Sequence, residues 1–222
     1  ALWEAGDRVE DETGTAVPSQ RLRTGALAFV AKDVPGLGAK RYFLHARLAG
    51  PNEAEPGGTR AAGSGSLTLR VDGTSGAIAS LTWTNAGTDR ELVDAAKFPG
   101  LAHYLYVPGV DPAKAMAASD SGMSFEEGPV LTTIAVRSQA PGAQGLLREY
   151  RVVRGLGRLD IAVTVDKTPV REKEGVHIAF PFAVPGATVR VDTGWAWARP
   201  EADQIEGACR DFLCARDSVD LS

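Results

Sequence analysis

Three runs of nine residues, at 130–138, 146–154 and 158–166, constrain the fold more than any other feature of this sequence. Each run is rich in β-branched and other apolar residues, which favour strands. The runs are separated by Pro141-Gly142 and by Gly155-Leu156-Gly157, and both separators have the composition of turns. Because strands joined by short turns pair in opposite directions, the sequence predicts an antiparallel meander and therefore a mainly β fold.

A predicted hairpin precedes this meander. In residues 67–72 apolar and polar side chains alternate, which is typical of a strand with one buried face. The turn composition of residues 73–76 leads into a second strand at 77–84. Three more short strands are expected nearer the N-terminus, at residues 21–23, 26–31 and 40–48.

Helix-favouring sequence is confined to residues 111–119. Pro112 suits the first turn of a helix, and Lys114 and Met116 are good helix formers. The sequence predicts one short helix here.

Residues 51–66 are the best candidate for a linker or mobile loop. They are dense in glycine, proline and small polar residues, which cannot bury enough apolar surface to order themselves. Residues 1–50, which precede this segment, are too few for a complete sandwich. Residues 67–222 then form the main β domain. Because Ser222 falls within an apparent strand, we expect the final sheet to need residues from elsewhere, and dimerisation through this edge is a hypothesis.

Composition excludes some classes of partner. The chain has 222 residues, of which 44% are hydrophobic and 23% charged, so it can bury a substantial core. Its net charge is −4 with both signs interspersed, which argues against a nucleic-acid partner. No apolar run reaches the roughly 18 residues of a membrane helix, so no membrane partner is expected. The N-terminus lacks a signal pattern, but a chain that begins at Ala1 leaves its compartment undetermined.

The stretch 166–212 combines unlike features. An alternating-charge cluster, residues 171–174, precedes an apolar strand at 176–180. Pro181 lacks a backbone donor, so the strand must break or bend there. Residues 188–192 alternate again and predict another strand.

Motifs in this stretch and elsewhere resemble the C-terminal β-rich part of glycoside hydrolase family 38, the zinc-dependent α-mannosidases. The anchors are VREKEGVHIAFPF (170–182), RPEADQIEGACRDF (199–212) and SVDLS (218–222), supported by residues 69–72, 76–81, 89–94, 17–20, 27–30 and 34–38. The resemblance covers nearly the whole chain except residues 51–66 and 111–124.

This resemblance implies a fold, a function and partners. The fold would be an antiparallel β-supersandwich of the galactose mutarotase type over residues 67–222, preceded by part of a small β-sandwich at 1–50. An aspartate nucleophile and zinc would belong to an N-terminal catalytic domain that this sequence lacks. We therefore expect no metal or other cofactor here. The implied partners are mannose-containing glycans and that catalytic domain.

Tyr104 is the one site residue that the resemblance carries over. The segment 102–108 looks like a family strand whose first tyrosine reaches the catalytic pocket, where its phenol could bind a substrate hydroxyl. The alternative is an amphipathic core tyrosine. Tyr106 is interpreted as core, and His103 as either a pocket residue or a structural histidine.

Weaker candidates remain. Trp195 and Trp197 lie two apart, on one face if the backbone is extended, and would either stack on a sugar or plug one end of a sandwich. The charge cluster 171–174 would either orient a ligand or form solvated ion pairs. Cys209 and Cys214 are interpreted as buried free thiols, with a disulfide as the alternative, since further zinc ligands are not nearby.

Three functions follow as hypotheses. In the first, the chain is the β portion of an α-mannosidase, acting as a scaffold and lending Tyr104 to the sugar pocket. In the second, it is an independent carbohydrate-binding module without hydrolytic activity. A third, resting on fold analogy, is mutarotase-like acid/base catalysis by His177 with Glu174.

Overall fold

The computed structural model describes residues 6–46, 61–210 and 213–222. The chain divides into two compact units, residues 1–181 and residues 182–222. Strands dominate the described residues, and all of their pairings are antiparallel. The predicted mainly β, antiparallel class is therefore confirmed.

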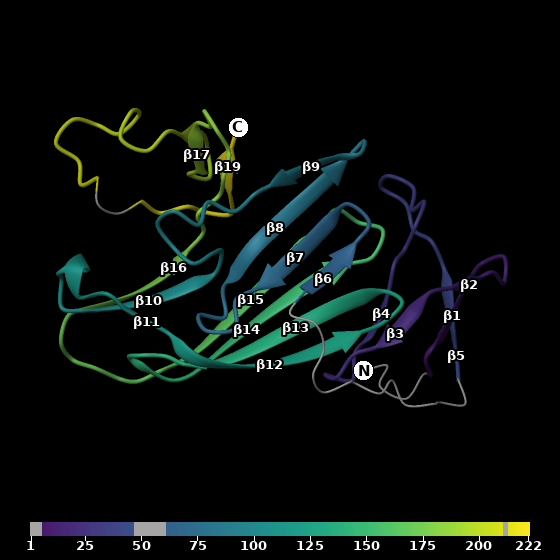
Figure 1. The fold of residues 1–222 in the computed structure, drawn as a ribbon. Helices are drawn as coiled ribbons and strands as arrows, with labels where there is room; N and C mark the ends of the chain where they lie inside the picture. The colour runs from purple at the N-terminus through teal and green to yellow at the C-terminus, as the bar shows by residue number, and fades with distance from the viewer. Residues whose placement is uncertain (1–5, 47–60, 211–212) are drawn as a thin grey trace. The chain divides into compact units, whose positions relative to one another are not determined.

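The largest sheet of the first unit is the predicted meander (Figure 1). Its strands follow chain order: β12 (Ser119–Glu127), β13 (Leu131–Gln139), β14 (Ala143–Val153) and β15 (Leu159–Lys167). The three expected strands correspond to β13, β14 and β15. The first strand, β12, was not expected. Its sequence is rich in serine and acidic residues, and cross-strand pairing with β13 compensates for that low intrinsic preference.

A second four-stranded sheet contains the predicted hairpin. Its strands are β6 (Ala61–Ser64), β7 (Leu67–Val71), β8 (Ile78–Asn85) and β9 (Thr88–Glu91). Most of the expected linker, residues 51–60, lies outside the described residues. Its last part nevertheless forms β6 rather than a loop, because backbone pairing with β7 requires no large side chains.

A third, three-stranded sheet has the order β11-β10-β16. It comprises β10 (His103–Pro108), β11 (Met116–Ala117) and β16 (Glu174–Ala179). The expected helix at 111–119 shrinks to the 3₁₀ turn η1 (Pro112–Lys114). Helical geometry ends at Ala115, whose ψ is 132°, and the next two residues pair with β10 instead.

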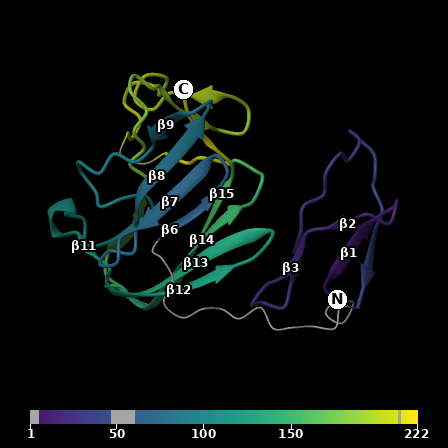
Figure 2. The same cartoon turned by 45° about the vertical axis from the view of Figure 1, so that its right-hand side comes forward.

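The core lies between the sheets of the first unit. Apolar side chains of β6–β8 pack against those of β13 and β14, including fully buried Leu69, Ile134 and Tyr150. Figure 2 shows β6–β8 beside one another next to the β12–β14 strands. A smaller cluster around Tyr104, Tyr106 and Leu146 joins the third sheet to the meander. From Leu146 to Val152 the even-numbered residues of β14 are buried in this core, so the odd-numbered residues between them lie on the opposite face.

The N-terminal strands form two small sheets. One has the order β2-β1-β5, with β1 (Arg8–Asp11), β2 (Ala16–Val17) and β5 (Tyr42–His45). The other pairs β3 (Ser19–Arg21) with β4 (Leu27–Phe29). The strands expected at 26–31 and 40–48 correspond to β4 and β5. The strand expected at 21–23 is wrong beyond Arg21, because residues 22–25 form a tight turn in which the amide of Gly25 donates to the carbonyl of Leu22.

Gln20 fastens these strands to the meander. Its side chain is 2% exposed, and its Oε1 accepts hydrogen bonds from the backbone amides of Val130 at 3.3 Å and Leu131 at 3.0 Å. A Cβ at Gly128 would collide with the Gln20 amide, so a glycine is needed for this close approach. Two buried donors thus find their acceptor from a distant part of the sequence.

The second unit holds one small sheet of order β18-β17-β19. Its strands are β17 (Val189–Asp192), β18 (Trp197–Ala198) and β19 (Val219–Leu221). The strand expected at 188–192 is confirmed as β17, and the apparent strand at the end of the sequence forms β19. The expected break at Pro181 is also confirmed, since β16 ends at Ala179.

Arg148 on β14 is fully buried in the first unit. Its guanidinium donates to the carbonyl of Ser75 at 2.7 Å, the hydroxyl of Ser138 at 2.7 Å and the carbonyl of Ala102 at 3.2 Å. Burial lowers the pKa of Arg148 from its usual value. The turn next to it needs Gly76, whose φ is +66° and whose missing Cβ leaves room for the guanidinium.

We predict that Gly76→Ala destabilises the protein by more than about 2 kcal/mol, from left-handed backbone strain plus overpacking against Arg148 and Val136. Gly87→Ala is the matched control, because Gly87 also has positive φ, +78°, but open space around its Cβ position. It should cost only about 1 kcal/mol. Urea unfolding measures both, and equal losses would contradict a special packing requirement at Gly76.

Glu91, the last residue of β9, accepts several hydrogen bonds. Its carboxylate accepts from the hydroxyl of Ser80 at 2.6 Å and from the amides of Leu81 and Val93, each at 2.9 Å. Burial alone would raise the pKa of Glu91, but these hydrogen bonds outweigh it and lower the pKa below the usual value of 4.5.

We predict that the Glu91 contribution to stability is complete above pH 4.5 and disappears as the pH falls through the lower, folded-state pKa. The unfolded chain binds the proton more readily, so acidification favours unfolding. Urea midpoints between about pH 6 and 3 should fall less steeply for Glu91→Gln than for the wild type. Parallel curves would show that Glu91 is not linked to folding.

Candidate functional site

Tyr104 lies in the interior of the first unit. Its side chain is fully buried, and its hydroxyl donates a 2.7 Å hydrogen bond to the carbonyl of Pro141 in the turn before β14. Burial and the nearby Glu174 carboxylate raise the pKa of Tyr104, so its phenol stays protonated. The hydroxyl thus joins β10 to that turn, and its role towards a substrate stays a prediction.

An ion pair between Lys167 and Glu174 lies beside Tyr106. Lys167 pairs with Glu174 at 2.7 Å, and its ammonium lies 5.7 Å from the centroid of the Tyr106 ring. Hydrogen bonding to Lys167 and Tyr106 lowers the pKa of Glu174. The Tyr106 ring rests against Gly142, where a Cβ would clash with it. Tyr106 is thus a core residue, as interpreted, and Glu174 pairs with β15 rather than with its neighbours at 171–173.

His103 and His177 lie on the paired strands β10 and β16, two register positions apart, whereas His45 lies on β5. His103 is 5% exposed beside Phe98, and burial together with the charge of Arg148 lowers its pKa, which favours the neutral imidazole. His177 lies on β16, where its ring covers Gly175. Glu174 is three residues away on the same strand and therefore points to the opposite face. The suggested pairing of His177 with Glu174 is wrong in this geometry.

The second unit contains the two tryptophans and the two cysteines that the sequence offered as candidates. Trp195 is fully exposed within the turn closed by the hydrogen bond from the Thr193 amide to the Ala196 carbonyl, whereas Trp197 lies in β18. The extended backbone that would align the two rings is absent.

Cys209 and Cys214 are both free and both exposed, which corrects the expectation of buried thiols. Turns and bends dominate residues 199–209, and Cys214 also lies outside any strand, so both thiols gain little cover.

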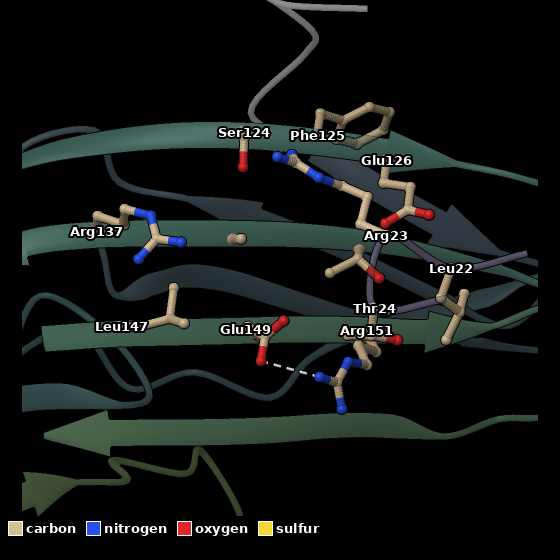
Figure 3. A pocket seen from close by; sticks show the side chains of 12 residues that line it. Leu22, Arg23, Thr24, Ser124, Phe125, Glu126, Arg137, Leu147, Glu149 and Arg151 are labelled. Carbon is tan, nitrogen blue, oxygen red and sulfur yellow. Dashed lines mark hydrogen bonds and ion pairs between the residues drawn. The ribbon is translucent and has the colours of Figure 1, made fainter. Parts of the chain in front are cut away.

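Sequence reasoning missed a cavity of about 450 Å³ on the face of the meander that points away from the core (Figure 3). Its floor comes from outward-facing residues of β12, β13 and β14, among them Ser124, Ala135 and Glu149. The turn at 22–25 supplies one wall through Leu22, Arg23 and Thr24. Alternation alone marks these strand residues as solvent-facing, so no local signal could have indicated a pocket.

The wall of this cavity is held in place from two sides. Arg21 donates to the carboxylate of Asp7 at 2.7 Å and to the carbonyls of Gly25 and Gly6 at 2.8 and 2.7 Å. Gln20, the residue before Arg21, is itself hydrogen-bonded to the meander. Arg23 and Thr24 are therefore presented on a turn whose two ends are anchored.

Charges of both signs line the cavity. Glu149 and Arg151 form an ion pair at 2.9 Å, shown as a dashed line in Figure 3. Arg23 and Arg137 have no carboxylate partner among the residues that the structure describes. In register, Arg137 lies opposite Gly122 and Leu147, neither of which can neutralise it.

Within the described ranges, no group of three or more His, Cys, Asp or Glu residues could hold a metal ion. None of the helical residues described forms a segment long and apolar enough to span a membrane. Comparisons with protein-family models, curated proteins and solved structures found no match.

We predict that Tyr104→Phe destabilises the protein by about 1 kcal/mol, because the partly buried Pro141 carbonyl loses its donor. In a chain of this size that corresponds to a fall in Tm of about 3 °C. Tyr42→Phe is the control, since the Tyr42 hydroxyl makes only an exposed contact of 3.5 Å with Lys32. Calorimetry of both variants measures the difference in Tm. An unchanged Tm for Tyr104→Phe would show that the Tyr104 hydroxyl does not contribute to the stability of the fold.

Proposed function

We propose that this chain is the non-catalytic β portion of a zinc-dependent retaining α-mannosidase similar to glycoside hydrolase family 38. It would act as a scaffold for a catalytic domain that hydrolyses terminal α-mannosides. The ordered sequence motifs between residues 17 and 222 suggest the family. The antiparallel sheets are compatible with a supersandwich, which remains the finer proposal for the fold.

One observation carries the scaffold role. The buried polar groups of the core are directed to the backbone of connecting segments: Tyr104 to Pro141, Tyr150 to Gly76, and Arg148 to Ser75. These contacts hold loops in fixed positions relative to the sheets. Rigid loops are what a neighbouring catalytic domain would need from a supporting surface. Any contribution of Tyr104 to a sugar pocket would be secondary to this role.

A test uses the full open reading frame that encodes this chain. The whole protein should hydrolyse 4-nitrophenyl α-mannoside, lose that activity on chelation and regain it with zinc. The 222-residue chain alone should show no turnover. Turnover by the isolated chain, or a full-length protein without zinc-dependent mannosidase activity, would refute the proposal.

An independent carbohydrate-binding module is the second candidate, and the cavity on the meander favours it. Pockets of a few hundred Å³ are common ligand sites. Calorimetric titration of the isolated chain with mannose and α-mannobiose separates the two ideas. A scaffold predicts no heat at millimolar sugar, whereas a mannoside-binding module predicts saturable binding.

A further inference from the structure

We propose that the cavity between the turn at 22–25 and the outer face of β12–β14 binds an acidic saccharide through its carboxylate. The ligand class is a hexuronate unit, either free or within a glycan. This proposal does not depend on the scaffold role proposed above, and it assigns to the cavity a ligand other than the mannosides considered for a binding module. Four observations lead to this ligand: volume, rigidity, charge and the arrangement of polar groups.

The cavity has the right size and is already formed. Its volume of about 450 Å³ falls within the range for small-ligand pockets. The floor consists of paired strands, and the wall is the turn anchored through Gln20 and Arg21. The backbone that carries the lining residues is therefore fixed before a ligand binds, which limits the entropic cost of binding to ordering side chains.

The charge distribution selects an anion. Three arginines and two glutamates line the cavity, although the chain as a whole has a net charge of −4. The Glu149–Arg151 ion pair uses one charge of each sign. In Figure 3 the guanidinium groups of Arg23 and Arg137 lie on either side of Ser124. Guanidinium groups prefer the planar, bidentate geometry of a carboxylate, so these two arginines form a suitable clamp.

The remaining lining selects a polyol rather than a simple acid. Glu126 has no ion-pair partner among the described residues, and it can accept hydrogen bonds from hydroxyl groups. Ser124 and Thr24 add hydroxyls that both donate and accept. Ala135 and Leu147 add apolar surface for the C–H face of a pyranose ring. A carboxylate next to several hydroxyls on a ring matches this combination.

The test titrates the chain with D-glucuronate and with methyl α-D-glucoside, which has a neutral group in place of the carboxylate. We expect saturable binding of glucuronate and binding of the glucoside at least tenfold weaker. Equal affinities, or no binding of glucuronate at 10 mM (roughly the weak limit of useful affinities), would overturn the proposal. Acetate that competes as well as glucuronate at equal concentration would also overturn it, since the site would then recognise any carboxylate.

Variants locate the binding. Arg137→Gln and Arg23→Gln should each weaken glucuronate binding at least tenfold, and both side chains are exposed, so the fold should persist. Arg90→Gln is the matched control: it removes one exposed arginine from β9, outside the cavity, and should leave the affinity unchanged. An equal loss of glucuronate affinity for Arg90→Gln would show that the effect arises from the overall charge of the protein, and it would refute the site.

Amide chemical-shift mapping provides an independent readout. Glucuronate should shift the resonances of Ser124, Ala135 and Arg137. Shifts centred on Tyr104 instead would contradict this site. Loss of mannosidase activity in the full-length protein would not bear on this result, so the two proposals can fail separately.

Discussion

The first unit depends on one buried cation. The Arg148 guanidinium sits where a charge is costly, and it persists there because oxygen atoms from three separate segments accept its hydrogen bonds. Ser75 belongs to the β7–β8 turn, Ser138 to β13, and Ala102 directly precedes β10. One side chain therefore links three sheets, and the space it occupies explains why the adjoining turn requires Gly76.

The cost of an unsatisfied buried polar group also explains which polar side chains are structural and which remain free to meet a ligand. Polar side chains inside the core, such as Tyr104 and Tyr150, spend their donors on backbone carbonyls, because an unsatisfied buried group would be costly. Burial raises the pKa of Tyr150 to about 12, so its hydroxyl remains a donor at physiological pH. Groups with unused binding capacity, such as Arg137, lie on the other face of the meander, where solvent or a ligand can meet them.

The site illustrates the limit of sequence reasoning. Tyr104 was indicated by a motif, and its burial could be anticipated as the alternative interpretation, but its hydroxyl partner is 37 residues away. Glu174 and His177 look like neighbours in sequence, yet strand geometry places them on opposite faces. The cavity left no motif, because its lining comes from alternate residues of β13 and β14, from three residues of β12 and from a turn about 100 residues earlier.

Sequence reasoning predicts the class of fold and most of the meander, because alternation at period two and turn-forming residues act locally. It misjudged β6, β12 and residues 111–119, where pairing with a neighbouring strand outweighs weak local preference. Which face of β14 packs into the core and which lines a cavity depends on tertiary contacts. Contacts such as that between Gln20 and Leu131, 111 residues apart, create that distinction and leave no local pattern.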